Sequence, residues 1–149
     1  MSTERDRIRM TDGEVAEFLA AQRKLHVATL NRDGSPHLVP MYFALVDGAV
    51  AFWTYTRSQK IRNLQRDPRI TVMAESGEAY LDLRGVQISG VGRLTADPAA
   101  VGAFGERLYE RQYGALDDGA RAYVARSAGK RTVVTVEPRR VGSWDHSKL

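Results

Sequence analysis

Residues 52–69 read FWTYTRSQKIRNLQRDPR, and this stretch decides the fold because its residue pattern changes once along its length. The first five residues are aromatic or β-branched, which favours a strand. Beyond Ser58, Ile61 and Leu64 stand three positions apart among basic residues, which predicts a short helix with a narrow apolar stripe. Ser58 occupies the position of an N-cap, and the Asp-Pro pair near the end of the stretch stops the helix. The sequence therefore predicts a strand that leads directly into a capped, basic helix.

The start of this helix has the features of an anion site. Backbone N–H groups in the first turn of a helix lack intrahelical partners, and the helix dipole adds partial positive charge there. Ser58 caps that turn, and Arg57 and Lys60 flank it. We therefore expect an anion pocket at residues 57–60. The same pattern has an alternative interpretation, a solvated surface helix whose basic residues serve solubility.

Composition is typical of a globular protein with an anionic partner. The chain has 149 residues, enough for one domain that buries about two-thirds of the surface of its unfolded chain. The hydrophobic content of 43% and the charged content of 27% are ordinary. No cysteine is present, which excludes disulfides and thiolate chemistry. The net charge of +4 and the isoelectric point near 9.6 favour a nucleic acid, a phosphate-bearing cofactor or an acidic lipid as partner.

Targeting, membrane and metal signals are missing from the sequence. No apolar run reaches the roughly 20 residues of a membrane span, and the charged first ten residues contain no signal-peptide core. We therefore expect a cytoplasmic protein with no membrane partner, in which residues 1–10 are frayed. The three histidines, His26, His37 and His146, lack the spacing of metal ligands, so no metal site is expected.

The remaining pattern predicts a mainly β chain. A capping box of Thr11 and Glu14 begins a helix that runs to about Gln22. Short strands separated by tight turns predict an antiparallel barrel or sandwich. Pro40 cannot donate to a central ladder, so it marks an edge, a bulge or a place open for a ligand. The expected strands are residues 25–30, 37–46 (broken at Pro40), 50–56, 70–75, 79–94 (with a β-bulge at 84–85) and 132–136 with Val141, and further helices begin near Asp97 and at Asp117 or Asp118.

No group of side chains in the sequence predicts catalysis by the protein itself. No serine stands in a nucleophile elbow, and no pair of carboxylates has the pattern of general acid–base catalysis. An anion pocket without catalytic residues has two explanations. The protein is a binding module, or a bound cofactor supplies the reactive atom while the protein orients it.

The pattern T-x-x-x-S-x-K-x-x-N-L-x-x-D-P-R at residues 54–69, preceded by the strand sequence GSPHLVPMYF at 34–43, resembles the pyridoxamine 5'-phosphate oxidase-like split β-barrel superfamily. The resemblance covers roughly residues 12–145. The short chain and the Ser-Gln-Lys variant of the motif are most similar to the branch of F420-dependent oxidoreductases, which use a deazaflavin. The resemblance implies a mainly β fold, a six- to seven-stranded antiparallel split β-barrel of the FMN-binding type. It also implies a homodimer with a cofactor groove between the subunits.

The resemblance implies a role for each residue of the basic helix start. Lys60 and Ser58 would hold the phosphate of the cofactor. Gln59 would lie near the phosphate, and Arg57 would lie at the rim of the site. These four residues coincide with the anion pocket expected from the residue pattern.

The resemblance also places residues along the rest of the cofactor. Thr54 and Trp53 would line the wall beside the phosphate and the sugar-like chain. Val39, Pro40 and Met41 would pass their backbone along the ring system, which gives Pro40 a function. Trp53 has an alternative role in the core, because aromatic residues dominate burial.

Two further residues would act from a distance or from the second subunit. Arg32, on the first hairpin turn, would reach the anionic tail of the cofactor from the other subunit. Trp144 would cover one face of the ring. The alternatives are a solvated turn residue for Arg32 and a partly buried core residue for Trp144.

Three departures from vitamin B6 oxidases change the expected activity. The tail VGSWDHSKL lacks the Arg-x-His-x-Arg-like motif that holds the vitamin phosphate in those enzymes. Gln59-Lys60 stands where they have Arg-Lys, and Gly85 stands where they have glutamine. Vitamin B6 oxidation is therefore not expected, and FMN remains only the alternative cofactor to F420.

These expectations define a first function and two rivals. The first is a reductase that transfers hydride from reduced F420 to a small conjugated acceptor such as an enone, a quinone or a tetrapyrrole, with no catalytic side chain. The second is an FMN-binding flavoprotein of the same fold. The third is a non-enzymatic barrel that binds a cofactor or single-stranded nucleic acid. Nucleic acid is the less favoured partner, because most of the few aromatic residues lie on apolar strand faces and leave few stacking platforms.

Overall fold

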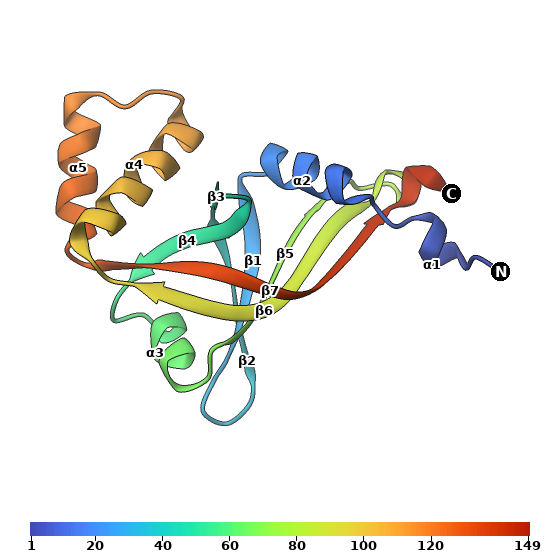
Figure 1. Ribbon diagram of the computed structural model, residues 1–149, viewed down its shortest axis with the longest axis horizontal. Coiled ribbons are helices and arrows are strands. Elements are labelled where there is room, and N and C mark those ends of the chain that lie inside the picture. The colour runs from blue at the N-terminus through green and yellow to red at the C-terminus, as the bar shows by residue number, and fades with distance from the viewer.

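Seven antiparallel strands dominate the computed structural model, which describes residues 1–149 (Figure 1). The strands are β1 (Lys24–Leu30), β2 (Pro36–Tyr42), β3 (Ala44–Val46), β4 (Ala49–Tyr55), β5 (Arg69–Ser76), β6 (Arg84–Thr95) and β7 (Arg131–Asp145). The helices are α1 (Glu4–Arg7), α2 (Asp12–Ala21), α3 (Gln59–Arg66), α4 (Pro98–Tyr113) and α5 (Asp118–Ala128), with short 3-10 helices η1 (Tyr80–Asp82) and η2 (His146–Lys148). The strands form one sheet in the order β2-β1-β5-β6-β7-β4-β3, which curls into an open barrel. The predicted mainly β, split-barrel fold is confirmed.

Two hydrophobic cores lie on opposite faces of the curled sheet. The larger one fills the barrel beneath α2 and α3, and Phe52 of β4 and Val134 of β7 belong to it. The smaller one lies between the outer face of β4 and β7 and the pair α4 and α5, and Trp53 and Val133 belong to it. Successive residues of a strand point to opposite faces, so β4 and β7 are buried on both sides where the cores meet. This explains the continuous apolar run of β4, which has no polar alternation.

Figure 1 shows how the helices surround the sheet. Helices α4 and α5 lie together beside β4 and the first residues of β7. Helix α3 lies near the C-terminal end of β4, beside the β1–β2 ribbon. The two chain ends lie together at the opposite end of the molecule, beyond the first residue of β6 and the last residue of β7. No helix is long and apolar enough to cross a membrane.

The predicted local signals of the helices are present. Thr11 accepts a hydrogen bond from the amide of Glu14 (3.2 Å), whose side chain accepts one from the Thr11 amide (3.0 Å). Asp97 and Asp117 cap α4 and α5 through their carboxylates. The first ten residues, for which we expected fraying, include α1 and the buried Met10.

The predicted bulge at residues 84–85 is wrong. Residues 80–82 form η1, so the change of phase marks the end of a helical turn and not a bulge inside a strand. The register shift lies further along, between Ser89 and Gly90, which pair with Arg140 and Pro138 and leave Arg139 as the extra residue on β7. A Cβ on Gly90 would lie 2.0 Å from the carbonyl oxygen of Glu137, so glycine is required at this crossing.

Two strand boundaries also differ from the prediction. The break expected at Pro40 falls at Phe43, whose side chain is fully buried, and Pro40 lies within β2 opposite His26. Strand β7 does not end near Val136 but continues to Asp145, because β6 pairs with it along its whole length. Of the three interpretations of Pro40, the edge is correct, since β2 pairs only with β1.

Candidate functional site

The N-terminus of α3 forms a cradle of hydrogen-bond donors. Ser58 is the N-cap, and its hydroxyl accepts from the amide of Ile61 (3.4 Å). The hydroxyl of Thr54, from the end of β4, donates to the same oxygen (3.4 Å). The backbone amides of Gln59 and Lys60 donate to no acceptor in the chain. Two free amides and two hydroxyl groups therefore meet at the positive end of a helix dipole.

Lys60 adds an uncompensated charge to this cradle. The side chain of Lys60 is half-buried and makes neither an ion pair nor a hydrogen bond. Burial lowers the pKa of its ammonium from the ordinary value of 10.5. The first turn of α3 contains no acidic residue. An anion bound here would supply the missing partner for this charge.

The position of α3 depends on Asn63, which is not among the site residues predicted from the sequence. Asn63 is fully buried, and its amide donates to the hydroxyl of Thr29 (3.0 Å) and to the side-chain oxygen of Asn31 (3.0 Å). Its own oxygen accepts from the side-chain amide of Gln59 (2.8 Å). Asn63 therefore fastens α3 to the end of β1. A signal is present in the sequence, because this asparagine belongs to the quoted motif and directly precedes the apolar Leu64.

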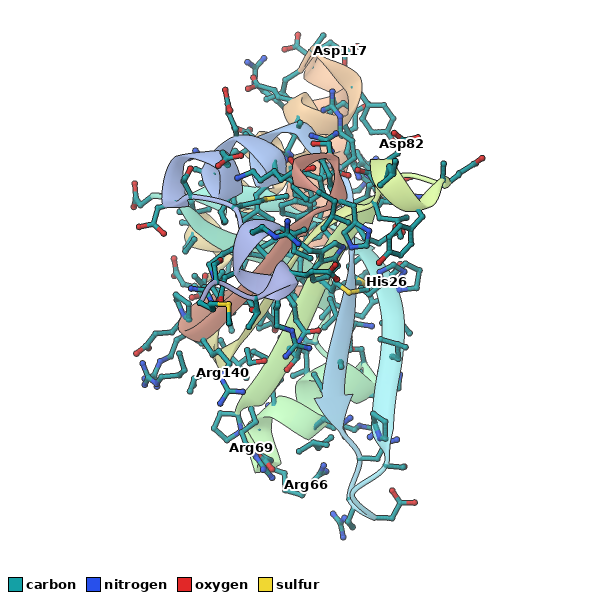
Figure 2. The ribbon with its side chains drawn as sticks, turned by 90° about the vertical axis from the view of Figure 1, so that its right-hand side faces the viewer. His26, Arg66, Arg69, Asp82, Asp117 and Arg140 are labelled. Atoms are coloured by element: carbon teal, nitrogen blue, oxygen red, sulfur yellow. The ribbon has the colours of Figure 1, made fainter.

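Not all basic residues around α3 are free to bind a ligand. Arg66 donates to the carbonyl of Leu30 and to Asn63, and Arg69 forms an ion pair with Asp67 (2.7 Å). Figure 2 shows Arg66 and Arg69 together at the end of the molecule where α3 lies. Arg57, just before Ser58, is exposed and has no ion pair. Arg66 and Arg69 are therefore engaged by groups of the chain itself, whereas the charges of Arg57 and Lys60 are free to bind a ligand.

The edge strand β2 offers unpaired backbone. Strand β2 pairs only with β1, so its second edge has no partner strand. Val39 and Met41 are half-buried and Pro40 is exposed, as alternation along a strand requires. Backbone groups on such an edge are available to hydrogen-bond to a planar ring. Arg32, in the turn between β1 and β2, is exposed.

Trp53 and Met41 lie together at a second feature, a cavity of about 460 Å³ bounded by β2, β4, α4, α5 and the first residue of β7. Trp53 is buried, with 8% of its surface exposed, on the face of β4 opposite Thr54. The guanidinium of Arg131 lies over the Trp53 ring, 4.7 Å from its centroid. Arg131 gave no signal in the sequence, because an arginine at the start of a strand is common.

Trp144 lies far from these residues in the same chain. Trp144 is the next-to-last residue of β7. Thr132, the second residue of that strand, pairs with Thr54, so Trp144 and the cradle lie at opposite ends of β7. Trp144 pairs with Gly85, and a Cβ on Gly85 would lie 2.1 Å from the indole. The indole thus occupies the space where the side chain of residue 85 would stand. Within one chain, the structure brings together Thr54, Ser58, Gln59 and Lys60, and separately Met41 and Trp53, but not Trp144.

Comparisons with known proteins agree with this topology. Among curated proteins, none matches the chain. A conserved hypothetical protein of Mycobacterium tuberculosis, Rv2991, has 38% identity and a TM-score of 0.93 over 99% of this chain and 92% of its own. A solved structure described as an F420 reductase has 24% identity and a TM-score of 0.69, covering 85% of this chain and 94% of its own.

A more distant structure extends the comparison. An FAD-binding protein from Mesorhizobium loti has 17% identity and a TM-score of 0.66, covering 90% of this chain and 94% of its own. At these identities, the reductase and the FAD-binding protein share the fold with this chain and nothing more is implied. The sequence model of the family described as pyridoxamine 5'-phosphate oxidase matches residues 11–145. Because that match includes every strand of the curled sheet and the cradle at α3, the chain belongs to the pyridoxamine 5'-phosphate oxidase family of flavin-binding split barrels.

Proposed function

We propose that the protein is an F420-dependent reductase whose cofactor phosphate is held at the N-terminus of α3. The observation that carries the proposal is the unpaired, half-buried ammonium of Lys60 beside two free backbone amides. Burying a charge without a partner costs stability, and such sites are typically retained for ligand binding. The structural likeness to an F420 reductase supports the choice of a deazaflavin.

The chain's own residues fit a phosphate-bearing cofactor. The amides of Gln59 and Lys60 and the hydroxyl of Ser58 would donate to phosphate oxygens, and the Lys60 ammonium would balance their charge. Arg57 stands at the rim of this cradle. Gln59 would contribute through its backbone, because its side chain is engaged by Asn63. Thr54 fixes the position of the Ser58 hydroxyl.

The ring of the cofactor would lie along the open edge of β2. The backbone of Val39, Pro40 and Met41 would pass along the ring at that edge, where Pro40 offers only its carbonyl oxygen. When bound, a reduced deazaflavin supplies a hydride to a conjugated acceptor such as an enone, a quinone or a tetrapyrrole. The protein's part is to orient both molecules and to exclude water, which requires no catalytic side chain. Arg32 would contact an anionic tail.

A homodimer forms part of this proposal. Trp144 lies at the opposite end of β7 from the residues near the cradle, so it would cover the ring of a cofactor whose phosphate is held at the cradle only from a second subunit. Leu38 on the open strand and Tyr55 at the end of β4 are 64% and 57% exposed. Large exposed apolar side chains beside an unpaired strand edge favour coverage by another chain.

FMN is the second candidate cofactor. The cradle recognises phosphate, which FMN also carries, and an FAD-binding protein has the same fold. Gly85, in place of the glutamine of vitamin B6 oxidases, removes one side chain that FMN would use. An FMN protein would be yellow when purified and would release its flavin on denaturation.

The test is a titration of the purified protein with F420 and with FMN. We expect micromolar affinity for F420, weakened by at least about 1.5 kcal/mol in Lys60→Ala, as loss of a charge-assisted phosphate contact requires. Arg62→Ala is the matched control, because Arg62 is exposed on the same helix, two residues after Lys60. Equal affinity of the wild type and Lys60→Ala would contradict the proposal. Oxidation of reduced F420 by a panel of conjugated acceptors then tests the activity.

A further inference from the structure

The cavity on the outer face of β4 has a composition suited to a specific ligand. Its volume of about 460 Å³ lies in the range of small-molecule sites. Aromatic side chains and one cation dominate its lining, and no acidic residue contributes to it. Its aromatic residues are Tyr42, Trp53, Tyr109, Tyr113 and Tyr123, and its cation is Arg131.

Arg131 is the only charged residue of this lining, and no acidic or hydrogen-bonding group of the chain pairs with it. Its guanidinium lies over two rings, 4.7 Å from the centroid of Trp53 and 4.4 Å from that of Tyr55. Its side chain makes no ion pair and no hydrogen bond, and its Nε atom is buried without an acceptor. Contact with both rings restricts the motion of the guanidinium, which keeps its N–H donors in place for a ligand. A carboxylate is the group that satisfies such donors best.

A group of tyrosines forms the other wall. The rings of Tyr109 and Tyr113 on α4 have centroids 4.5 Å apart, and the ring of Tyr123 on α5 lies 6.4 Å from Tyr109. Tyr113 is 68% exposed, so the cavity opens to solvent on this side. Aromatic walls favour a flat ligand, because offset and edge-to-face contacts both add to apolar burial.

We propose that this cavity binds a planar conjugated carboxylate, with its acid group on Arg131 and its unsaturated body between Trp53 and the tyrosines. The inference deepens the proposed function, because Met41 borders both this cavity and the strand edge assigned to the cofactor ring. An acid bound here is then the hydride acceptor itself, or its carboxylate is the part of a larger acceptor that determines specificity. The acceptor class narrows from any small conjugated molecule to one that carries a carboxylate.

Calorimetric titration of the cofactor-free protein with cinnamate, and with its neutral analogue cinnamamide, tests the binding directly. Cinnamate is flat, unsaturated and anionic, and its amide differs only in charge and donor pattern. We expect the wild type to bind the acid at least about tenfold more tightly than the amide. Arg131→Gln should abolish this preference. Arg126→Gln is the control, because Arg126 is an exposed arginine of α5 outside the cavity.

A second variant keeps the test valid if Arg131→Gln does not fold. Tyr113→Ala removes an exposed ring, and we expect it to weaken the acid and the amide alike, by about two- to tenfold. No measurable binding of cinnamate, equal binding of acid and amide by the wild type, or a preference retained in Arg131→Gln would each overturn the inference. Acid binding by a protein that binds neither F420 nor FMN would keep the inference and refute the proposed function. F420 binding without acid binding would keep the proposed function and refute the inference.

Discussion

The indole of Trp53 lies directly against Gly105 of α4, so close that a Cβ on this glycine would stand 2.4 Å from the ring. Val124 of α5 would lie 2.8 Å from the same atom. Gly105 thus lets α4 approach β4 and sets the floor of the aromatic cavity. The glycine stands in the interior of a helix, where its propensity is poor, so packing determines its presence.

Two glycines of α4 should respond to alanine with opposite signs. For Gly102, the nearest atom to an added Cβ is 3.9 Å away, so Gly102→Ala should stabilise the fold by about 0.5–1 kcal/mol through helix propensity. Gly105→Ala should destabilise it by about 1–3 kcal/mol, because Trp53 must move. Urea unfolding of both variants measures the two changes, and tryptophan fluorescence should shift only in Gly105→Ala. Stabilisation by both substitutions would show that α4 does not press on Trp53.

Asn63 should be essential for holding α3. Asn63→Ala leaves Thr29 and Asn31 without their donor inside the protein and removes the partner of Gln59. Loss of a buried hydrogen-bonded group of this kind should cost about 2–4 kcal/mol of unfolding free energy. Gln65→Ala, an exposed position of the same helix, should change it by less than about 0.5 kcal/mol. A loss in Asn63→Ala no larger than the loss in Gln65→Ala would mean that the buried amide does not hold α3 in place.

The sequence predicted what short-range rules determine. Ser58 was expected as an N-cap, and Thr11 with Glu14 as a capping box, because each depends only on residues within one turn. A strand over residues 50–56 is predicted because aromatic and β-branched residues crowd it, and β4 lies at Ala49–Tyr55. In each case the residues that determine the structure are neighbours in the chain.

Features that depend on distant partners were missed or misplaced. The length of β7 depends on pairing with β6, and nothing near Pro138 in the sequence announces that the strand continues past a proline. The register shift opposite Gly90 arises where two long strands cross, and the change of phase near Gly85, which predicts a bulge, comes from the helical turn at Tyr80–Asp82 instead. Arg131 acquires its environment from β4, many residues away in the chain. Such contacts become visible only when the topology is known.

Stability should depend on pH through Glu14. Its carboxylate accepts from the Lys148 ammonium (2.8 Å) and from the Thr11 amide (3.0 Å), and these contacts lower its pKa from 4.5 to about 2. A depressed folded-state pKa adds stability that is complete above pH 4.5 and is lost as the pH falls toward 2. The urea midpoint of the wild type should therefore exceed that of Glu14→Gln at neutral pH. The two midpoints should converge near pH 2.

Glu17→Gln is the control for that experiment. Glu17 is exposed on the same helix and makes no ion pair, so this variant should follow the wild-type profile. A constant gap between the wild type and Glu14→Gln from pH 6 to pH 2 would show that the contact between the chain ends does not depend on the carboxylate charge.

Lys60 should lower the stability of the free protein and strengthen its binding of an anion. Because burial lowers its pKa, the folded state disfavours the ammonium, and the stability of the free protein should rise as the pH increases from that lowered value toward 10.5. Lys60→Met should remove this rise and leave the urea midpoint at neutral pH equal to or above that of the wild type. The same variant should bind inorganic phosphate and F420 more weakly. Arg62→Met, a change at an exposed position of the same helix, should leave both the urea midpoint and the binding unaltered. A lower midpoint with undiminished binding in Lys60→Met would show that Lys60 has a structural role and does not bind an anion at the cradle.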